Sequence, residues 1–218
     1  KTKMFAGNPI YSFILLVLIL GAAITVHEFS HAWVASKLGD PTAKLQGRVS
    51  LNPMRHLDPL GTIMIFIANI GWGKPVPVNP RNFKNPIRDN ALVSMAGPLS
   101  NLITAMIAGY PFKFFASHSF YGSAFLSELF SGFIMVSVVL FLFNLLPFKP
   151  LDGAAILGYF VPQKHFFKYE KFMEDHIGHF MAFILIDLFI FKNFLDLSLV
   201  ETLIMTPANY LIQFILLG

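Results

Sequence analysis

The residues best suited to chemistry are His27, Glu28 and His31, which form an HExxH sequence near the end of a long apolar run. On an α-helix, His27 and His31 stand at positions i and i+4, so they share one face about one turn apart. That spacing suits two imidazole ligands of a single zinc ion. Glu28 lies beside this face, where its carboxylate can serve as the general base toward a metal-bound water. The pattern therefore predicts one catalytic zinc site.

The segment before this motif, residues 10–26, contains no charged side chain. Ionisable groups are costly inside a membrane-spanning helix and usually serve a function there. A chance HExxH sequence is common on soluble helices, but its place in an apolar helix favours the zinc site. The apolar run is too long for a signal peptide and has no small-residue cleavage site, so we expect a retained helix over about 10–38.

A hydrolytic zinc site needs a third protein ligand and an open fourth position. Asp152 is the best candidate, because it follows the predicted helix 125–146 at the same depth as the two histidines. Pro147 and Pro150 break the chain just before it, and Gly153 allows close backbone approach. Asp152 could also cap a short helix that follows Pro150, and this role is compatible with that of a ligand.

The composition indicates a membrane protein, since 55% of the 218 residues are hydrophobic and only 13% are charged. The absence of cysteine excludes disulfides and thiolate zinc sites, so zinc must use histidine and carboxylate. The net charge of +4 is better explained by membrane topology than by nucleic-acid binding, and we expect no nucleic-acid partner.

We expect an all-α polytopic membrane protein whose residues 1–218 form a single integral-membrane domain. About five spanning helices are predicted, at residues 10–38, 89–112, 125–146, 176–191 and 197–217. Short half-helices are expected at 60–70 and after Pro150. The segment 71–79 contains prolines and alternating valines, which exclude a helix and predict a membrane-associated strand or hairpin.

The basic residues predict the orientation of these helices. Twelve of the sixteen Lys and Arg residues fall in segments 37–88 and 149–171, which places both segments in the cytoplasm. His27 lies roughly 25 Å along the helix from Ile10, at about 1.5 Å per residue. The metal site should therefore lie toward the cytoplasmic side of the membrane.

Three motifs in order resemble the site-2 protease family of intramembrane zinc metalloproteases. They are the apolar HExxH helix, Gly97-Pro98-Leu99-Ser100-Asn101, and Asn144 followed by Leu151-Asp152-Gly153. The resemblance covers a core of about 10–160. It implies that His27, His31 and Asp152 bind zinc, that Glu28 activates water, and that Asn101 and Asn144 belong to the active-site region.

The resemblance also implies the activity and its setting. It predicts an intramembrane zinc endopeptidase of a bacterial inner membrane that cuts membrane-anchored proteins, such as membrane-bound transcription regulators or anti-sigma-factor-like proteins. Residues 113–124 leave no room for an inserted soluble domain, so the chain looks like a compact member without a PDZ-like insertion. The helices within 176–217 would gate substrate entry. Lys149 departs from the proline that is usual in this family, which leaves the local loop shape open.

The sequence leaves several alternatives open. A zinc transporter or a zinc-stabilised membrane scaffold would also use such ligands, although neither explains the three motifs together. Asn101 and Asn144 could instead form interhelical hydrogen bonds. His176 and His179 are spaced i, i+3 and could bind metal or form an interfacial structural pair.

Overall fold

The computed structural model describes residues 9–68, 71–191 and 198–217. It is mostly helical, and its described part contains no β-sheet, only an isolated antiparallel bridge between Leu57 and Gly73. This agrees with the all-α prediction. The segment 71–79 runs extended, as predicted, but it forms no hairpin ladder among the described residues.

Four helices are long and apolar enough to cross a membrane, where about five were expected. They are α1 (Pro9–Lys37), α4 (Pro86–Ser117), α5 (Ser123–Asn144) and α10 (Leu199–Leu217). The predicted span at 176–191 forms α8 (Ile177–Leu185) and a π-helical turn η3 (Ile186–Phe191). This described stretch is shorter than the ~20 residues that a spanning helix needs.

The shorter elements fill the connections between these helices. They are α2 (Thr42–Leu45), η1 (Pro53–Arg55), α3 (Pro59–Ala68), η2 (Pro80–Asn82), α6 (Asp152–Phe160) and α7 (Gln163–Asp175). The predicted half-helices at 60–70 and after Pro150 correspond to α3 and α6. The helix α4 begins with a proline, which is favoured at a first helical position because its missing N–H needs no partner there.

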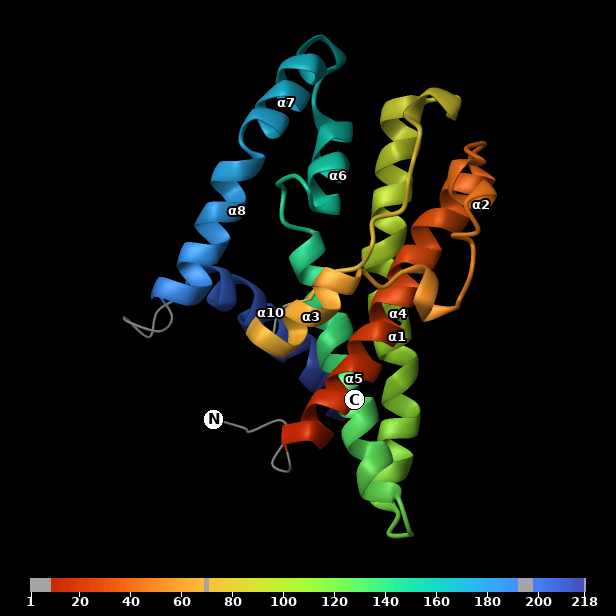
Figure 1. Ribbon diagram of the computed structural model, residues 1–218, viewed down its shortest axis with the longest axis vertical. Helices are drawn as coiled ribbons and strands as arrows, with labels where there is room; N and C mark the ends of the chain where they lie inside the picture. The colour runs from red at the N-terminus through yellow and green to blue at the C-terminus, as the bar shows by residue number, and fades with distance from the viewer. Residues whose placement is uncertain (1–8, 69–70, 192–197, 218) are drawn as a thin grey trace.

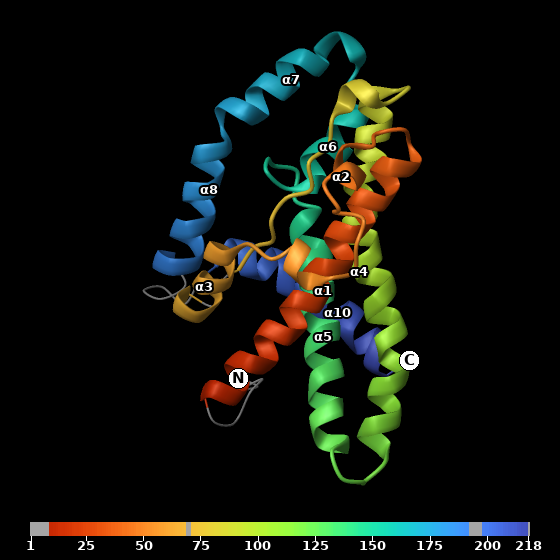
Figure 2. The ribbon, with the colours of Figure 1, turned by 45° about the vertical axis from the view of Figure 1, so that its right-hand side comes forward.

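The helices α1, α4 and α5 pack side by side, as Figure 1 and Figure 2 both show. Small residues line part of this packing, since Ala105 and Ala108 of α4 are buried against Ile134 and Val138 of α5. Small side chains let helix backbones approach closely. The helix α10 covers the same cluster through Ala208.

The helices α7 and α8 form an arm that stands apart from the α1, α4 and α5 bundle (Figure 2). The arm follows α6, and the far end of α8 returns to the bundle. There Ile184 packs with Val200 and Ile204 of α10. The bundle holds the two histidines, while the residues before and after Asp152 face the arm.

Candidate metal centre

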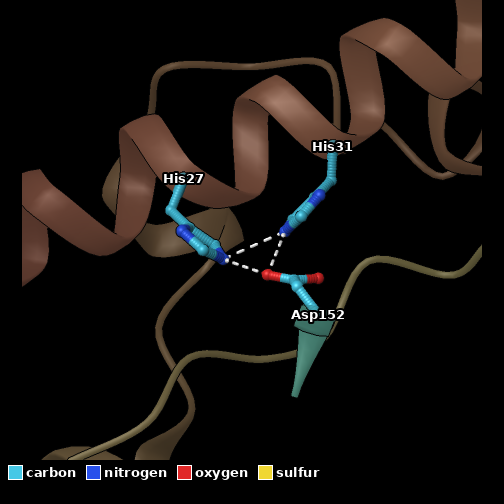
Figure 3. Close-up of side chains that lie close together, drawn as sticks. All are labelled: His27, His31 and Asp152. Atoms are coloured by element: carbon cyan, nitrogen blue, oxygen red, sulfur yellow. Dashed lines mark hydrogen bonds and ion pairs between the residues drawn. The ribbon is translucent and has the colours of Figure 1, made fainter. Parts of the chain in front are cut away.

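The three predicted metal ligands meet in one buried cluster (Figure 3). His27 and His31 come from α1, and Asp152 is the first residue of α6. The two histidine Nε2 atoms are 3.0 Å apart, and Asp152 Oδ2 lies 3.2 Å from that of His27 and 3.4 Å from that of His31. Among the described residues, this is the one group of histidines and carboxylates close enough to hold a metal ion.

The dimensions of this triangle fit zinc. Zinc binds nitrogen and oxygen at about 2.0–2.2 Å, so the ligand atoms of a tetrahedral site stand roughly 3.3–3.6 Å apart. The observed edges are 3.0, 3.2 and 3.4 Å, so the triangle is at most about 0.3 Å tighter than this range, and small side-chain movements would open it around the ion. Asp152 Oδ2 is also buried without a hydrogen-bond partner in the described part of the chain. A cation would satisfy this atom together with the two ring nitrogens that face it.

Each imidazole has a partner for its second ring nitrogen. His31 Nδ1 lies 2.7 Å from the carbonyl oxygen of Val93, which can only accept a hydrogen bond. This contact leaves His31 Nε2 as the unprotonated nitrogen that a metal requires. Such a partner fixes the tautomer and the ring orientation of a metal ligand.

Asn101 performs the same task for His27. The side-chain nitrogen of Asn101 lies 3.3 Å from His27 Nδ1, and Asn101 is fully buried. Asn101 Oδ1 is buried without a partner among the described residues. Because a half-turn of the amide exchanges its oxygen and nitrogen, Oδ1 can accept the proton of His27 Nδ1. The structure thus brings Asn101 to the site as a neighbour of the ligand His27.

Gly97 explains why the second motif passes so close to the histidines. A Cβ atom at this position would lie 2.3 Å from His31 Nε2 and 2.7 Å from His27 Nε2. Real Cβ atoms essentially never come that close to another heavy atom, so only glycine leaves room for both rings. The sequence marked Gly97 as part of a motif but could not show this contact.

Glu28 faces the extended segment 71–79. Its Oε2 atom accepts a hydrogen bond of 3.1 Å from the backbone N–H of Val76. A Cβ atom at Gly73 would lie 3.5 Å from Glu28 Oε1, so the backbone of this segment passes directly beside the carboxylate. The predicted base and the predicted strand are therefore neighbours.

Arg48, one of the basic residues in segment 37–88 that predict the membrane topology, also belongs to the site, a role that the sequence did not indicate. The side chain is 4% exposed, and its positive charge acts on the Glu28 carboxylate. Its guanidinium donates to the carbonyls of Lys74 and Pro75, the latter at 3.1 Å. Arg48 thus fastens the extended segment next to Glu28. No spacing rule in the sequence connects these residues.

The remaining candidates have other partners. The side chain of Asn144 donates to the Leu140 carbonyl of its own helix at 3.0 Å. The ring centres of His176 and His179 are 5.5 Å apart, and this pair belongs to no metal-binding group within the described residues.

Comparison with known proteins finds relatives that share the name "Putative zinc metalloprotease". The chain is 50% identical to YwhC of Bacillus subtilis over 165 residues, which cover 72% of this chain and 74% of YwhC. It is 35% identical to Rip2 of Mycobacterium tuberculosis over 157 residues, which cover 67% of this chain and 58% of Rip2. No protein-family model and no solved structure matches the chain.

Proposed function

Because the chain belongs to the zinc metalloprotease family that includes YwhC, we propose that it is an intramembrane zinc endopeptidase of the site-2 protease type. The observation that carries this proposal is the buried triangle of His27, His31 and Asp152, with Glu28 beside it in a helix apolar enough to span a membrane. The substrates are membrane-anchored proteins, cut within or near their own spanning helices. Membrane-bound transcription regulators and anti-sigma-factor-like proteins are the substrate class that we propose.

The side chains divide the chemistry among them. His27, His31 and Asp152 hold one zinc ion, which when bound supplies Lewis-acid activation of water and of the scissile carbonyl. Glu28 accepts a proton from the attacking water and delivers it to the leaving amine. Asn101 orients His27. An amide side chain, Asn144 or Asn101, is the candidate donor to the developing oxyanion, and Asn144 would use its second N–H, because the first donates to the Leu140 carbonyl.

The segment 71–79 would hold the substrate extended beside Glu28. A substrate helix must unwind, because a helical carbonyl is hydrogen-bonded and shielded, and an unwound stretch can add to an exposed strand edge. The Val76 N–H is bonded to Glu28, so this bond must break before Val76 can pair with a substrate through it. The alternative is a rigid loop, anchored by Arg48, that never touches the substrate.

Crosslinking distinguishes these two roles of the segment. In a Glu28→Gln background that traps the complex, a cysteine at Val76 or Val78 should crosslink to substrate residues that flank the scissile bond. Crosslinks that form only with the helices within 176–217 would show that the segment takes no part in binding.

We place the protein in a bacterial inner membrane with the metal centre toward the cytoplasm. The support is the distribution of Lys and Arg, which are concentrated in 37–88 and 149–171. Cytoplasmic access to the site would suit the release of a regulator from its membrane anchor.

The decisive experiment incubates the purified protein with candidate single-span substrates. Wild-type protein should cleave them, a chelator should stop cleavage, and added zinc should restore it. The Glu28→Gln variant should keep its zinc but lose at least about 10²–10⁴-fold in rate, because the amide cannot accept the water proton.

Glu128→Gln is the matched control, since this glutamate lies in a spanning helix and bonds to Tyr11 near the start of α1. It should cleave like wild type. Near-normal cleavage by Glu28→Gln would exclude the mechanism. Zinc transport into vesicles without any cleavage would favour the transporter instead.

A further inference from the structure

The loop that leads to Asp152 is attached to the α7–α8 arm by an ion-pair cluster. We call residues 145–151, which connect α5 to α6, the Asp152 loop. Lys149 Nζ in this loop lies 2.6 Å from Glu170 Oε2 and 3.2 Å from Glu174 Oε1, both on α7. Lys149 and Glu170 are half-buried, with 24% and 29% of their side chains exposed, so solvent screens this pair less than an open surface pair.

Two further contacts join the arm to the chain on either side of Asp152. The rings of Phe148 and Phe180 are stacked with their centres 4.0 Å apart. The hydroxyl of Tyr169 on α7 donates to the carbonyl of Ala154, two residues beyond Asp152, at 2.5 Å. A cavity of about 350 Å³ lies between the loop and the arm. The arm therefore meets the loop through discrete contacts, without a close-packed interface.

The residue that follows Asp152, Gly153, packs closely against the end of α5. A Cβ atom at Gly153 would lie 2.3 Å from the carbonyl oxygens of both Leu145 and Leu146. The start of α6 is thus folded tightly back onto the end of α5. Asp152 is held between this rigid contact and the contacts with the arm.

From this arrangement we propose that Lys149 is a positioning residue for Asp152. Lys149 ties the Asp152 loop to α7, so that metal binding and docking of the arm stabilise each other. The proposal rests on the zinc site of the proposed function but not on proteolysis. Burial lowers the pKa of Lys149, but the carboxylates of Glu170 and Glu174 raise it more, so its pKa lies above the ordinary value and the cation stays charged. Coupling between two sites is reciprocal, so zinc must stabilise the docked arm as much as the arm favours zinc.

The test measures zinc affinity by chelator competition, and hydrogen exchange of α7 with and without zinc, on the purified full chain. Lys149→Gln should weaken zinc binding by about 10–100-fold, the usual effect of losing a group that orients a ligand. It should also abolish the protection that zinc gives to residues 163–175. Lys168→Gln is the matched control, because Lys168 is an exposed lysine on α7. The double variant Lys149→Glu with Glu170→Lys should restore most of both properties.

The outcomes separate positioning from simple packing. Lower thermal stability with unchanged zinc affinity would overturn the proposal, and so would identical zinc affinity and protection in Lys149→Gln and Lys168→Gln. If Lys149→Gln does not fold, Glu170→Gln and Glu174→Gln measure the same coupling from the arm. If wild-type protein binds zinc but cleaves nothing, the proposed function fails while this proposal is still tested by the zinc measurements.

Discussion

Adding one methyl group at Gly97 should greatly weaken the binding of zinc. The new Cβ atom would lie 2.3 Å from His31 Nε2 and 2.7 Å from His27 Nε2. Non-bonded heavy atoms ordinarily stay about 3.5–4.0 Å apart, so the His31 ring must move by roughly 1 Å. Metal sites tolerate only about ±0.2 Å in ligand distance. We therefore expect Gly97→Ala to lose at least about 100-fold in zinc affinity, or about 2.8 kcal/mol at 1.4 kcal/mol per tenfold.

The assay is chelator competition on purified protein, followed by cleavage at saturating zinc. Gly109→Ala is the matched control on the same helix, because its Cβ atom would lie 2.9 Å from Ile215 Cγ2. It crowds the side chain of Ile215 and, at 3.1 Å, the backbone carbonyl oxygen of the same residue, neither of which belongs to the metal centre. It should cost about 1–3 kcal/mol of stability without changing zinc affinity. The reasoning is refuted if Gly97→Ala binds zinc as tightly as Gly109→Ala and wild type do.

Three further predictions concern the surroundings of the site. Asn101→Ala should lower zinc affinity by about 10–100-fold, because His27 loses the partner of its Nδ1 atom, and unchanged affinity would contradict this. Burial lowers the pKa of His56 below its ordinary value of 6.5, so the folded protein holds this imidazole neutral. The contribution of His56 to the free energy of unfolding should therefore be present above pH 6.5 and be lost as the pH falls below that value. Melting curves should show that the thermal stability of His56→Asn falls less below this pH than that of wild type. An equal fall in both proteins would exclude His56 as the cause. Cysteines at Lys84 and Lys168 should resist an impermeant thiol reagent in intact cells, whereas labelling of both would reverse the topology.

The helical part of the fold could be predicted well because lipid restricts the choice of structure. Backbone N–H and C=O groups in a bilayer must form hydrogen bonds within their own segment, so long apolar runs fold as helices. The predicted helices 10–38 and 125–146 match α1 and α5 to within a few residues. The helix α4 is longer than the predicted 89–112, because it continues through Pro111 to Ser117.

The segment 176–191 is less regular than predicted. It is helical in the described chain but divides into α8 and a π-helical turn, and its crossing of the membrane stays a prediction. Asp187 accepts hydrogen bonds there from Ser198 and from the N–H groups of Leu199 and Val200 at the start of α10. Hydropathy measures the composition of a segment and cannot detect such long-range capping.

The sequence by itself determined the chemistry of this protein. Local spacing places His27 and His31 on one helix face, and the absence of cysteine restricts the zinc ligands to histidine and carboxylate. The helix repeat places residues three or four positions apart on one face, so the relation between the two histidines can be read from their spacing alone.

Sequence motifs named Asp152 and Asn101 as candidates, but only the tertiary structure showed which distant residues contact the HExxH helix. Asp152 lies more than a hundred residues from His27, and Asn101, Arg48 and Gly97 meet the HExxH helix through packing of separate elements. The role of Lys149 likewise depends on an arm that follows it in the chain and folds back onto it. Contacts of this kind follow from the close approach of helices and loops in three dimensions, which no periodicity along one segment encodes.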